Sequence, residues 1–204
     1  MLGSPIRDRQ AERRSDTRAE ILEAAWVIAR EKGLAELTLR EVGARIGMRA
    51  PSLYSYFDSK NAIYDAMFAQ AWSGCLAAFD DLEKRLPRTP RAELKKMARA
   101  FFDYAVADLA RHQLMNQRTI SGFVPSTEAY APAVGVLERV RSHFVRCGVD
   151  RADHFDLYIA LVGGLIDAQQ ANDPGGSRWS ALLDQAIDMF ADHVGLPESR
   201  RKST

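Results

Sequence analysis

The chain has 204 residues, with 28 lysines and arginines against 27 aspartates and glutamates, and a formal net charge of +1. Its length and its 47% hydrophobic content suffice for one or two domains with a packed core. They exclude a disordered chain, a collagen-like repeat and a disulfide scaffold. The two cysteines, Cys75 and Cys147, lie far apart and indicate a reducing compartment. Near-neutral charge argues against a protein that coats nucleic acid through a broad basic surface, so any DNA contact must be a small, well-placed patch.

The sequence carries no targeting or membrane signal. Residues 1–18 alternate positive and negative charges and lack the apolar stretch of a signal peptide. The longest apolar run, from about Tyr158 to Ile166, is roughly half of what a bilayer span requires. We therefore expect a cytoplasmic protein that has no membrane partner.

Hydrophobic residues recur with helical spacing nearly everywhere, and no stretch keeps a convincing period-two alternation. This pattern predicts an all-α fold of about nine helices, without a sheet. Thr17 with Glu20, and Thr38 with Glu41, form capping boxes that begin two of the helices. The predicted helices run from about Thr17 to Lys32, Thr38 to Ile46, Ala50 to Tyr56, Ser59 to Leu86, Thr89 to Ala110, Arg111 to Ile120, Thr127 to Cys147, Asp150 to Ala171 and Arg178 to Val194.

Two of these helices are very short and are joined across Gly47. A short helix gains little stability alone, which suggests that these helices are present to position residues in space. Residues 39–57 have the layout of a helix-turn-helix. In the second short helix, Ala50, Leu53 and Phe57 share the side that can pack on the first. Small residues and hydroxyls on the other side would let the backbone approach a DNA groove closely. That outward side carries Pro51, Ser52, Ser55 and Tyr56, with Arg49 at its entry.

Lys60 occupies the first turn of the following helix, where the helix dipole favours an anion over a cation. A lysine at this position is explained if its partner is a DNA phosphate. Taken alone, however, Lys60 would be an ordinary surface lysine.

The segment from Thr17 to Phe68 resembles the DNA-binding domain of TetR-type transcriptional repressors. Its run Leu-Tyr-Ser-Tyr-Phe-Asp-Ser-Lys at 53–60 is similar to the family signature Leu-Tyr-x-[His/Tyr]-Phe-x-[Ser/Asn/Asp]-Lys, and the flanking Gly33 and Gly47 match in spacing. The resemblance implies an all-helical, dimeric, ligand-responsive regulator. Pro51 departs from the small residue that is frequent there, which leaves the base preference open. By resemblance the DNA contacts are Thr38, Arg49, Ala50, Pro51, Ser52, Tyr54, Ser55, Tyr56 and Lys60, of which Thr38, Tyr56 and Lys60 would hold phosphates, while Arg49, Ser52 and Tyr54 lie nearest the bases.

Two interpretations remain open at this end of the chain. Tyr54 is either a DNA contact or a partly buried packing residue. The arginines near the N-terminus form either a solvated tail or an arm that reaches the duplex. We divide the chain into a flexible charged arm at 1–16, a DNA-binding domain at 17–60, a ligand-sensing and dimerisation domain at 61–195 and a polar tail at 196–204.

The last two long helices are the expected dimer interface. Gly163 and Gly164 lie inside a helix, where each glycine costs about 1 kcal/mol relative to alanine, so the pair favours the close approach of another helix. The final helix is apolar over a wider arc than one core needs. Together they would form a four-helix interface across a twofold axis, the alternative being burial within one subunit. The interface residues are Ala160, Gly163, Gly164, Ala168, Ala171, Trp179, Leu183, Ile187 and Phe190.

A ligand pocket is expected between the helices that span 60–147. Aromatic and methionine residues at helical spacing can line such a pocket or form plain core. No large charged cluster points inward, which favours an apolar or weakly polar inducer over a polyanion. The candidate lining residues are Met67, Trp72, Phe101, Phe102, Tyr104, His112, Met115, Asn116, Phe123, Phe144 and Tyr158.

Other functions are less consistent with the sequence. It lacks a Gly-rich phosphate loop, a G-x-S-x-G motif and an H-E-x-x-H motif, so we expect neither an enzyme nor a cofactor. His143 and Cys147 have a spacing that can hold a metal, with His154 nearby, but two such ligands arise easily by chance, so we expect no metal site. The remaining alternative is an all-helical small-molecule-binding or interaction module without a DNA role. The favoured hypothesis is a dimeric repressor that binds a palindromic double-stranded DNA operator and is released by a small-molecule inducer.

Overall fold

The computed structural model describes residues 9–197. Residues 1–8 and 198–204, which hold half of the predicted arm and most of the predicted tail, lie outside the described residues. Within 9–197 the chain forms nine α-helices and two short 3-10 turns, and no strand, which confirms the predicted all-α fold. No helix in this range combines the length and the apolar character that crossing a bilayer requires.

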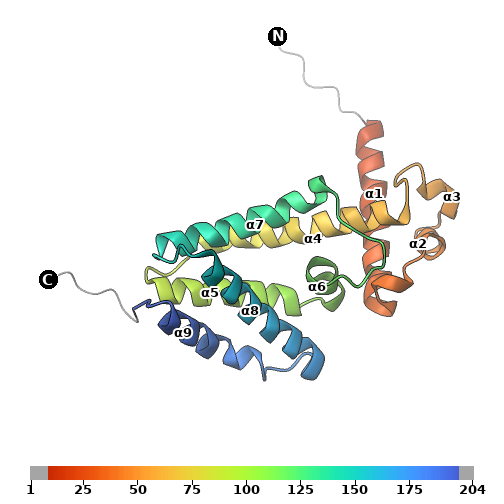
Figure 1. The fold of residues 1–204 in the computed structure, drawn as a ribbon. Coiled ribbons are helices and arrows are strands. Elements are labelled where there is room, and N and C mark those ends of the chain that lie inside the picture. The colour runs from red at the N-terminus through yellow and green to blue at the C-terminus, as the bar shows by residue number, and fades with distance from the viewer. Residues whose placement is uncertain (1–8, 198–204) are drawn as a thin grey trace, which may run out of the picture.

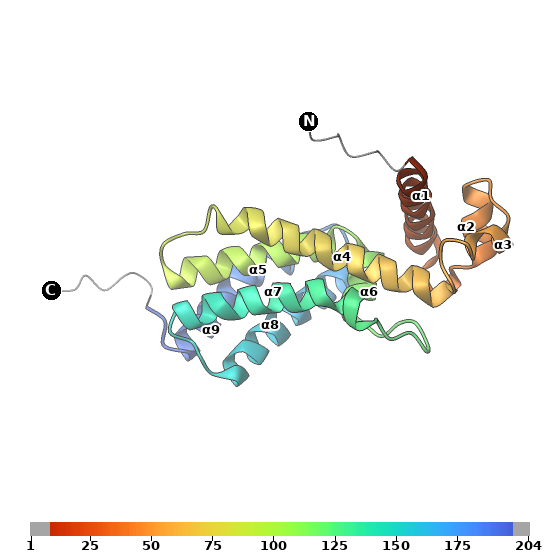
Figure 2. The same ribbon diagram turned by 90° about the horizontal axis from the view of Figure 1, so that it is seen from above.

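Three helices form a head at one end of the molecule: α1 (Arg9–Lys32), α2 (Leu39–Arg45) and α3 (Ala50–Leu53), with the 3-10 turn η1 (Leu34–Glu36) after α1. The head lies at the N-terminal end of the long helix α4 (Lys60–Glu83), which runs away from it (Figures 1 and 2). The inner sides of these helices are fully buried, so the head has an apolar core continuous with the start of α4.

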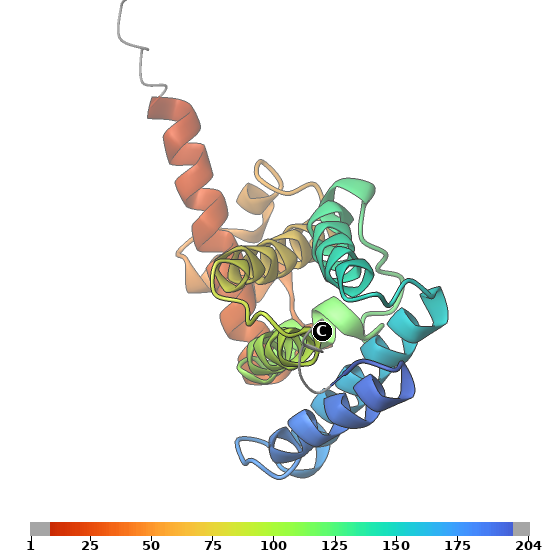
Figure 3. The ribbon, with the colours of Figure 1, turned by 90° about the vertical axis from the view of Figure 1, so that its left-hand side faces the viewer.

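Helices α4 to α9 form the body of the protein. α4 and α7 lie side by side and run in the same direction, while α8 and α9 form a pair on one side of the bundle (Figure 3). Asp65 near the head end of α4 accepts hydrogen bonds from Ser126 at the start of α7. The body helices are α5 (Pro90–Val106), α6 (Leu109–Asn116), α7 (Thr127–Arg146), α8 (Ala152–Asn172) and α9 (Leu183–His193), with the 3-10 turn η2 (Ser180–Leu182) before α9.

Helix α1 begins eight residues earlier than the sequence pattern predicts, at Arg9 rather than Thr17. The predicted capping box at Thr17 is therefore wrong: its hydroxyl donates to the carbonyl of Arg13 at 3.0 Å, as an interior helix residue does. The predicted flexible arm is likewise wrong for residues 9–16, which are helical. Contacts made by the arginines of this first part of α1 explain why it is ordered, as described below.

Other boundaries shift by a few residues. α3 ends at Leu53, and the chain continues to Tyr56 as a tighter turn rather than as helix. Asp108, whose side chain accepts from the amide of Arg111 at 3.0 Å, caps α6, so the break between α5 and α6 lies earlier than predicted. α8 is preceded by Arg151 rather than capped by Asp150, and α9 begins at Leu183 after η2 rather than at Arg178. The caps predicted at Thr38 and Ser59 are confirmed.

Candidate nucleic-acid interface

The turn between α2 and α3 is tight because two glycines permit it. The amide of Met48 donates to the carbonyl of Gly43 at 2.8 Å, and a Cβ on Gly43 would lie 2.6 Å from the Met48 carbonyl oxygen. Gly47 has a φ of +70°, a conformation that costs glycine little. These two positions let α3 cross α2 at close range, which gives the head its helix-turn-helix geometry.

Helix α3 has a buried side and an exposed side, as predicted. Leu53 and Phe57 are buried in the head, whereas the side chain of Tyr54 is 54% exposed, so Tyr54 is not a packing residue. Tyr56 and Ala50 are half-buried. The predicted contact residues that lie exposed are Thr38, Arg49, Pro51, Ser52, Tyr54 and Ser55.

Two arginines of α1 hold the C-terminal turn of α3, a feature that the sequence reasoning missed. Arg14 donates to the carbonyl of Ser55 at 2.7 Å, and its guanidinium lies 5.6 Å from the centre of the Tyr56 ring. Arg18 donates to the carbonyl of Tyr56 and stacks over the Phe57 ring at 4.0 Å. The two arginines are four positions apart, so both project from one face of α1, and this i, i+4 spacing is the signal that could have revealed them. We call Arg14 and Arg18 the α1 clamp.

At the other edge of the exposed face, Thr38 is engaged by its own helix. Its hydroxyl accepts from the amide of Glu41 at 3.2 Å and donates to the Glu41 carboxylate at 3.2 Å. A hydrogen bond from Lys32 is the main cause that holds the pKa of Glu41 below its usual range. Lys32 thereby offsets the negative charge of Glu41 beside Thr38.

Lys60 is the half-buried cation of this face. Its ammonium lies 5.5 Å from the centre of the Tyr64 ring. It makes no ion pair with any carboxylate in the part of the chain that the structure describes. Its charge is therefore free to meet an external anion.

Comparisons with known proteins agree with this geometry. Residues 21–67 match the model of the bacterial regulatory proteins of the tetR family. Over 193 residues, the chain is 25% identical to the tetracycline repressor protein class A from transposon 1721 of Escherichia coli. The match covers 86% of this chain and 81% of that protein. The chain thus matches the tetR family in its DNA-binding domain and is similar to one of its members over most of its length. It thus has the fold of a TetR-family transcriptional regulator, with a helix-turn-helix DNA-binding domain.

Two solved structures of the same fold cover most of the chain. The TetR-family regulator PfmR from Thermus thermophilus superposes with a TM-score of 0.63 at 22% identity, covering 83% of this chain and 96% of that one. The regulator FadR from Bacillus subtilis, solved with stearoyl-CoA, superposes with a TM-score of 0.66 at 14% identity, covering 84% and 96%. At these identities the likeness concerns the fold.

The body of the protein contains a cavity of about 410 Å³ between α4, α5, α6, α7 and α8. Its lining is mostly aromatic and aliphatic, and its polar residues gather where α6 faces α8. Six predicted lining residues are among those that border it: Trp72, Phe101, His112, Met115, Asn116 and Tyr158. Sequence reasoning missed Asp167, Tyr130 and Phe79, which border it too.

Five residues predicted to line the pocket lie elsewhere. Met67 and Phe102 are fully buried core residues, and the Tyr104 hydroxyl donates to the carbonyl of Ala71 at 2.6 Å. Phe144 lies in an aromatic cluster, 4.9 Å from the ring centre of Tyr158. Phe123 borders a neighbouring hollow and contacts the Tyr64 ring. These side chains form core contacts instead, because burial of a large apolar side chain stabilises the fold without a ligand.

Helix α8 presents a stripe of small and apolar side chains to solvent. Ala160, Gly164 and Ala171 are exposed, Ala168 is half-buried, and Leu157 is 46% exposed. A Cβ added at Gly164 would meet no atom within 4 Å. Nothing within the described protomer therefore accounts for the glycine.

The predicted interface residues of α9 are placed differently. Leu183, Ile187 and Phe190 are buried inside the protomer, so their prediction as interface residues is wrong; their apolar side packs on α5 and α8. Gly163 borders the cavity, and Trp179 is half-buried. The exposed apolar residues of this region are instead Leu182 and Met189.

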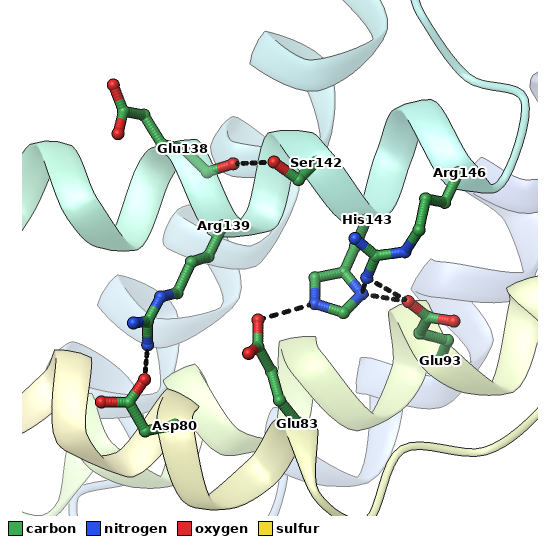
Figure 4. Close-up of polar contacts among 8 residues, drawn as sticks. All are labelled: Asp80, Glu83, Glu93, Glu138, Arg139, Ser142, His143 and Arg146. Carbon is green, nitrogen blue, oxygen red and sulfur yellow. Dashed lines mark hydrogen bonds and ion pairs between the residues drawn. The ribbon is translucent and has the colours of Figure 1, made fainter.

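His143 lies between two carboxylates near the end of the body opposite the head (Figure 4). Its Nε2 is 3.0 Å from Glu83 of α4, and its Nδ1 contacts Glu93 of α5. The ring therefore joins three helices rather than facing Cys147, its neighbour one turn on. Among residues 9–197 no cluster of three or more His, Cys, Asp or Glu side chains could hold a metal ion.

Proposed function

We propose that the chain is a dimeric, ligand-responsive transcriptional repressor that binds a palindromic DNA operator and is released by a small-molecule inducer, with no enzymatic activity. The observation that carries the proposal is the exposed face of α3, which the α1 clamp anchors at the turn that follows the helix. A recognition helix must present its side chains in a fixed orientation, because each base contact depends on hydrogen-bond geometry. Location in the cytoplasm stays a prediction.

On this face the residues divide into proposed base contacts and proposed phosphate contacts. Arg49, Ser52 and Tyr54 project from the exposed side of α3 and would read base edges. Thr38, Tyr56 and Lys60 lie at its margins and would contact phosphates. Ala50, Pro51 and Ser55 are small, which permits close approach to the groove.

The exposed stripe on α8 supports a homodimer. Small residues at helical spacing allow two helices to pack closely, and the pairing would bury the stripe around Ala160 and Gly164. Two α3 helices related by a twofold axis would then bind two half-sites of a palindrome. Sedimentation analysis tests this: Ala160→Asp should shift the protein toward monomer, whereas Ala77→Asp, at an exposed alanine of α4, should not.

A physical connection between the cavity and the head supports ligand response. His112, Met115 and Asn116 of α6 border the cavity, and Asp108, at the start of the same helix, accepts a hydrogen bond from Arg30 of α1 at 2.9 Å. A ligand that moves α6 would therefore act directly on the head. Release from DNA requires that the ligand binds one arrangement of the heads more tightly than the other. The FadR structure with stearoyl-CoA is a precedent for a small molecule in this fold.

Selection of duplexes from a random library with the purified protein tests the DNA role. The proposal predicts one enriched palindromic sequence, whose affinity falls steeply with salt concentration and exceeds that of random duplex at every concentration. Failure to enrich any sequence would favour the alternative, a helical small-molecule-binding or interaction module without a DNA role.

A further inference from the structure

The polar end of the cavity is a hydrogen-bonded group on α6 and α8. His112 is 3% exposed, and its Nε2 lies 2.9 Å from the carboxylate oxygen Oδ1 of Asp167. The side-chain amide of Gln117 donates to the same oxygen at 3.1 Å. The second oxygen of Asp167, Oδ2, makes no hydrogen bond to any residue between 9 and 197. It is therefore available to a ligand.

Asn116 lies against the other ring nitrogen of His112. Its side-chain amide nitrogen is 3.2 Å from His112 Nδ1 and 3.3 Å from the His112 carbonyl oxygen. His112 is therefore held from both sides, with Nε2 facing the Asp167 carboxylate.

The contact with His112 fixes the orientation of the Asp167 carboxylate. No lysine or arginine of the described chain forms an ion pair with Asp167, and Asp167 is the only formally charged side chain among the described residues that border the cavity. Its side chain is 58% exposed, which places it at the mouth rather than deep inside. The cavity therefore ends in a carboxylate that no lysine or arginine of the described residues pairs with.

The interior offers mainly aromatic faces, and the indole N–H of Trp72 is a buried donor there without a hydrogen-bond partner among the described residues. The rings of Trp72 and Phe101 stack with their centres 6.3 Å apart and their planes inclined by 22°. The Tyr158 hydroxyl is occupied, because it donates to the carbonyl of Leu94 at 2.9 Å, so Tyr158 presents its ring to the cavity. Such walls bind apolar or aromatic groups and attract cations to their faces.

We propose that the ligand of this cavity is an amphiphilic organic cation, with an aromatic or aliphatic body between Trp72, Phe101 and Tyr158 and a protonated amine at Asp167. The amine N–H would donate to Oδ2 while Oδ1 keeps its bonds to His112 and Gln117. A carboxylate or phosphate at the same place would meet a like charge with no compensating cation. The assignment deepens the ligand response proposed above and rests on it.

Three probes with one body and different headgroups test the assignment: 3,3-diphenylpropylamine, 3,3-diphenylpropan-1-ol and 3,3-diphenylpropanoate. Titration calorimetry on the full chain without DNA should give the amine at least a tenfold lower Kd than the alcohol, and the carboxylate the weakest binding. Asp167→Asn keeps an oxygen for His112 but removes the charge, and should reduce the amine preference to less than threefold. Asp156→Asn, at an exposed carboxylate of the same helix, is the matched control and should leave the preference unchanged.

The proposal is overturned if the carboxylate or the alcohol binds as tightly as the amine, if none of the three binds, or if Asp167→Asn and Asp156→Asn behave alike. Affinity for the selected duplex is measured separately for each variant. If the unaltered protein shows no preference for the amine but binds the duplex, only the ligand assignment is refuted. Absence of duplex binding in the unaltered protein refutes the regulatory role instead.

Discussion

Replacing Arg18 by methionine removes half of the α1 clamp while keeping an unbranched side chain of similar length. The substitution eliminates the hydrogen bond from the guanidinium to the Tyr56 carbonyl and the stacking over Phe57. A hydrogen bond from a charged donor contributes about 1.5–3 kcal/mol, and an exposed cation–ring contact about 0.5–1 kcal/mol. Because methionine retains part of the packing, we expect the free energy of unfolding to fall by about 2 kcal/mol.

The same change should weaken DNA binding through the orientation of α3. If the whole loss is expressed as undocking of the turn after Leu53, affinity for the selected duplex falls by at most about 30-fold, since about 1.4 kcal/mol corresponds to tenfold. Urea unfolding measures the first quantity, and fluorescence anisotropy with a labelled duplex measures the second. Arg13→Met, at an exposed arginine of the same helix, provides the control. Equal unfolding free energies and equal duplex affinities for Arg18→Met and Arg13→Met would refute the clamp.

Three further changes test the packing and the ionisation described above. Gly43→Ala places a methyl group 2.6 Å from a backbone oxygen of the turn and should lower the unfolding free energy by about 1–3 kcal/mol in urea titrations; an unchanged midpoint would contradict the close approach. Burial raises the pKa of Cys147 from 9.0 to about 11 and that of Cys75 to about 12. Iodoacetamide at pH 8 should therefore label Cys147 about 100-fold more slowly than an ordinary thiol, and Cys75 more slowly still. Mass spectrometry measures the labelling, and rates equal to those of the urea-unfolded protein would contradict the expectation. A hydrogen bond from Lys95 holds the pKa of Asp188 in the folded protein below its usual 3.8. The stability that the Asp188 carboxylate contributes is therefore complete above pH 3.8 and is lost as the pH falls through the lower pKa of the folded state. Asp188→Asn should lessen the loss of stability below about pH 4, and an unfolding free energy with the same pH dependence in both proteins would contradict this.

Local signals in the sequence were sufficient for the helix-turn-helix. The cap at Thr38, the cap at Ser59 and the turn at Gly47 depend on residues within three or four positions of one another, and the structure contains all of them. The exposed side of α3 followed from the spacing of Leu53 and Phe57 alone. Such features are predictable because their energetics depend on neighbouring residues.

Contacts between distant segments were not predictable in this way. Arg14 binds Ser55 across 41 positions, and His112 binds Asp167 across 55, and no short-range pattern pairs them. The same reason explains the errors on α9: an apolar stripe such as Leu183 and Ile187 predicts burial, but not whether the partner is α5 of the same chain or another protomer. Tertiary packing decides which of several apolar faces is covered.

The central claim is that the exposed face of α3 with Lys60 binds DNA, and anisotropy titration of one selected duplex tests it most directly. Arg49→Gln and Lys60→Gln should each raise Kd at least tenfold. Arg88→Gln removes an exposed arginine beyond the end of α4 remote from the head (Figure 1) and should leave Kd unchanged. Arg49→Gln should also reduce the preference for the selected duplex over random duplex, whereas Lys60→Gln should weaken both equally. If all three variants bind with the affinity of the unaltered protein, this face does not contact DNA.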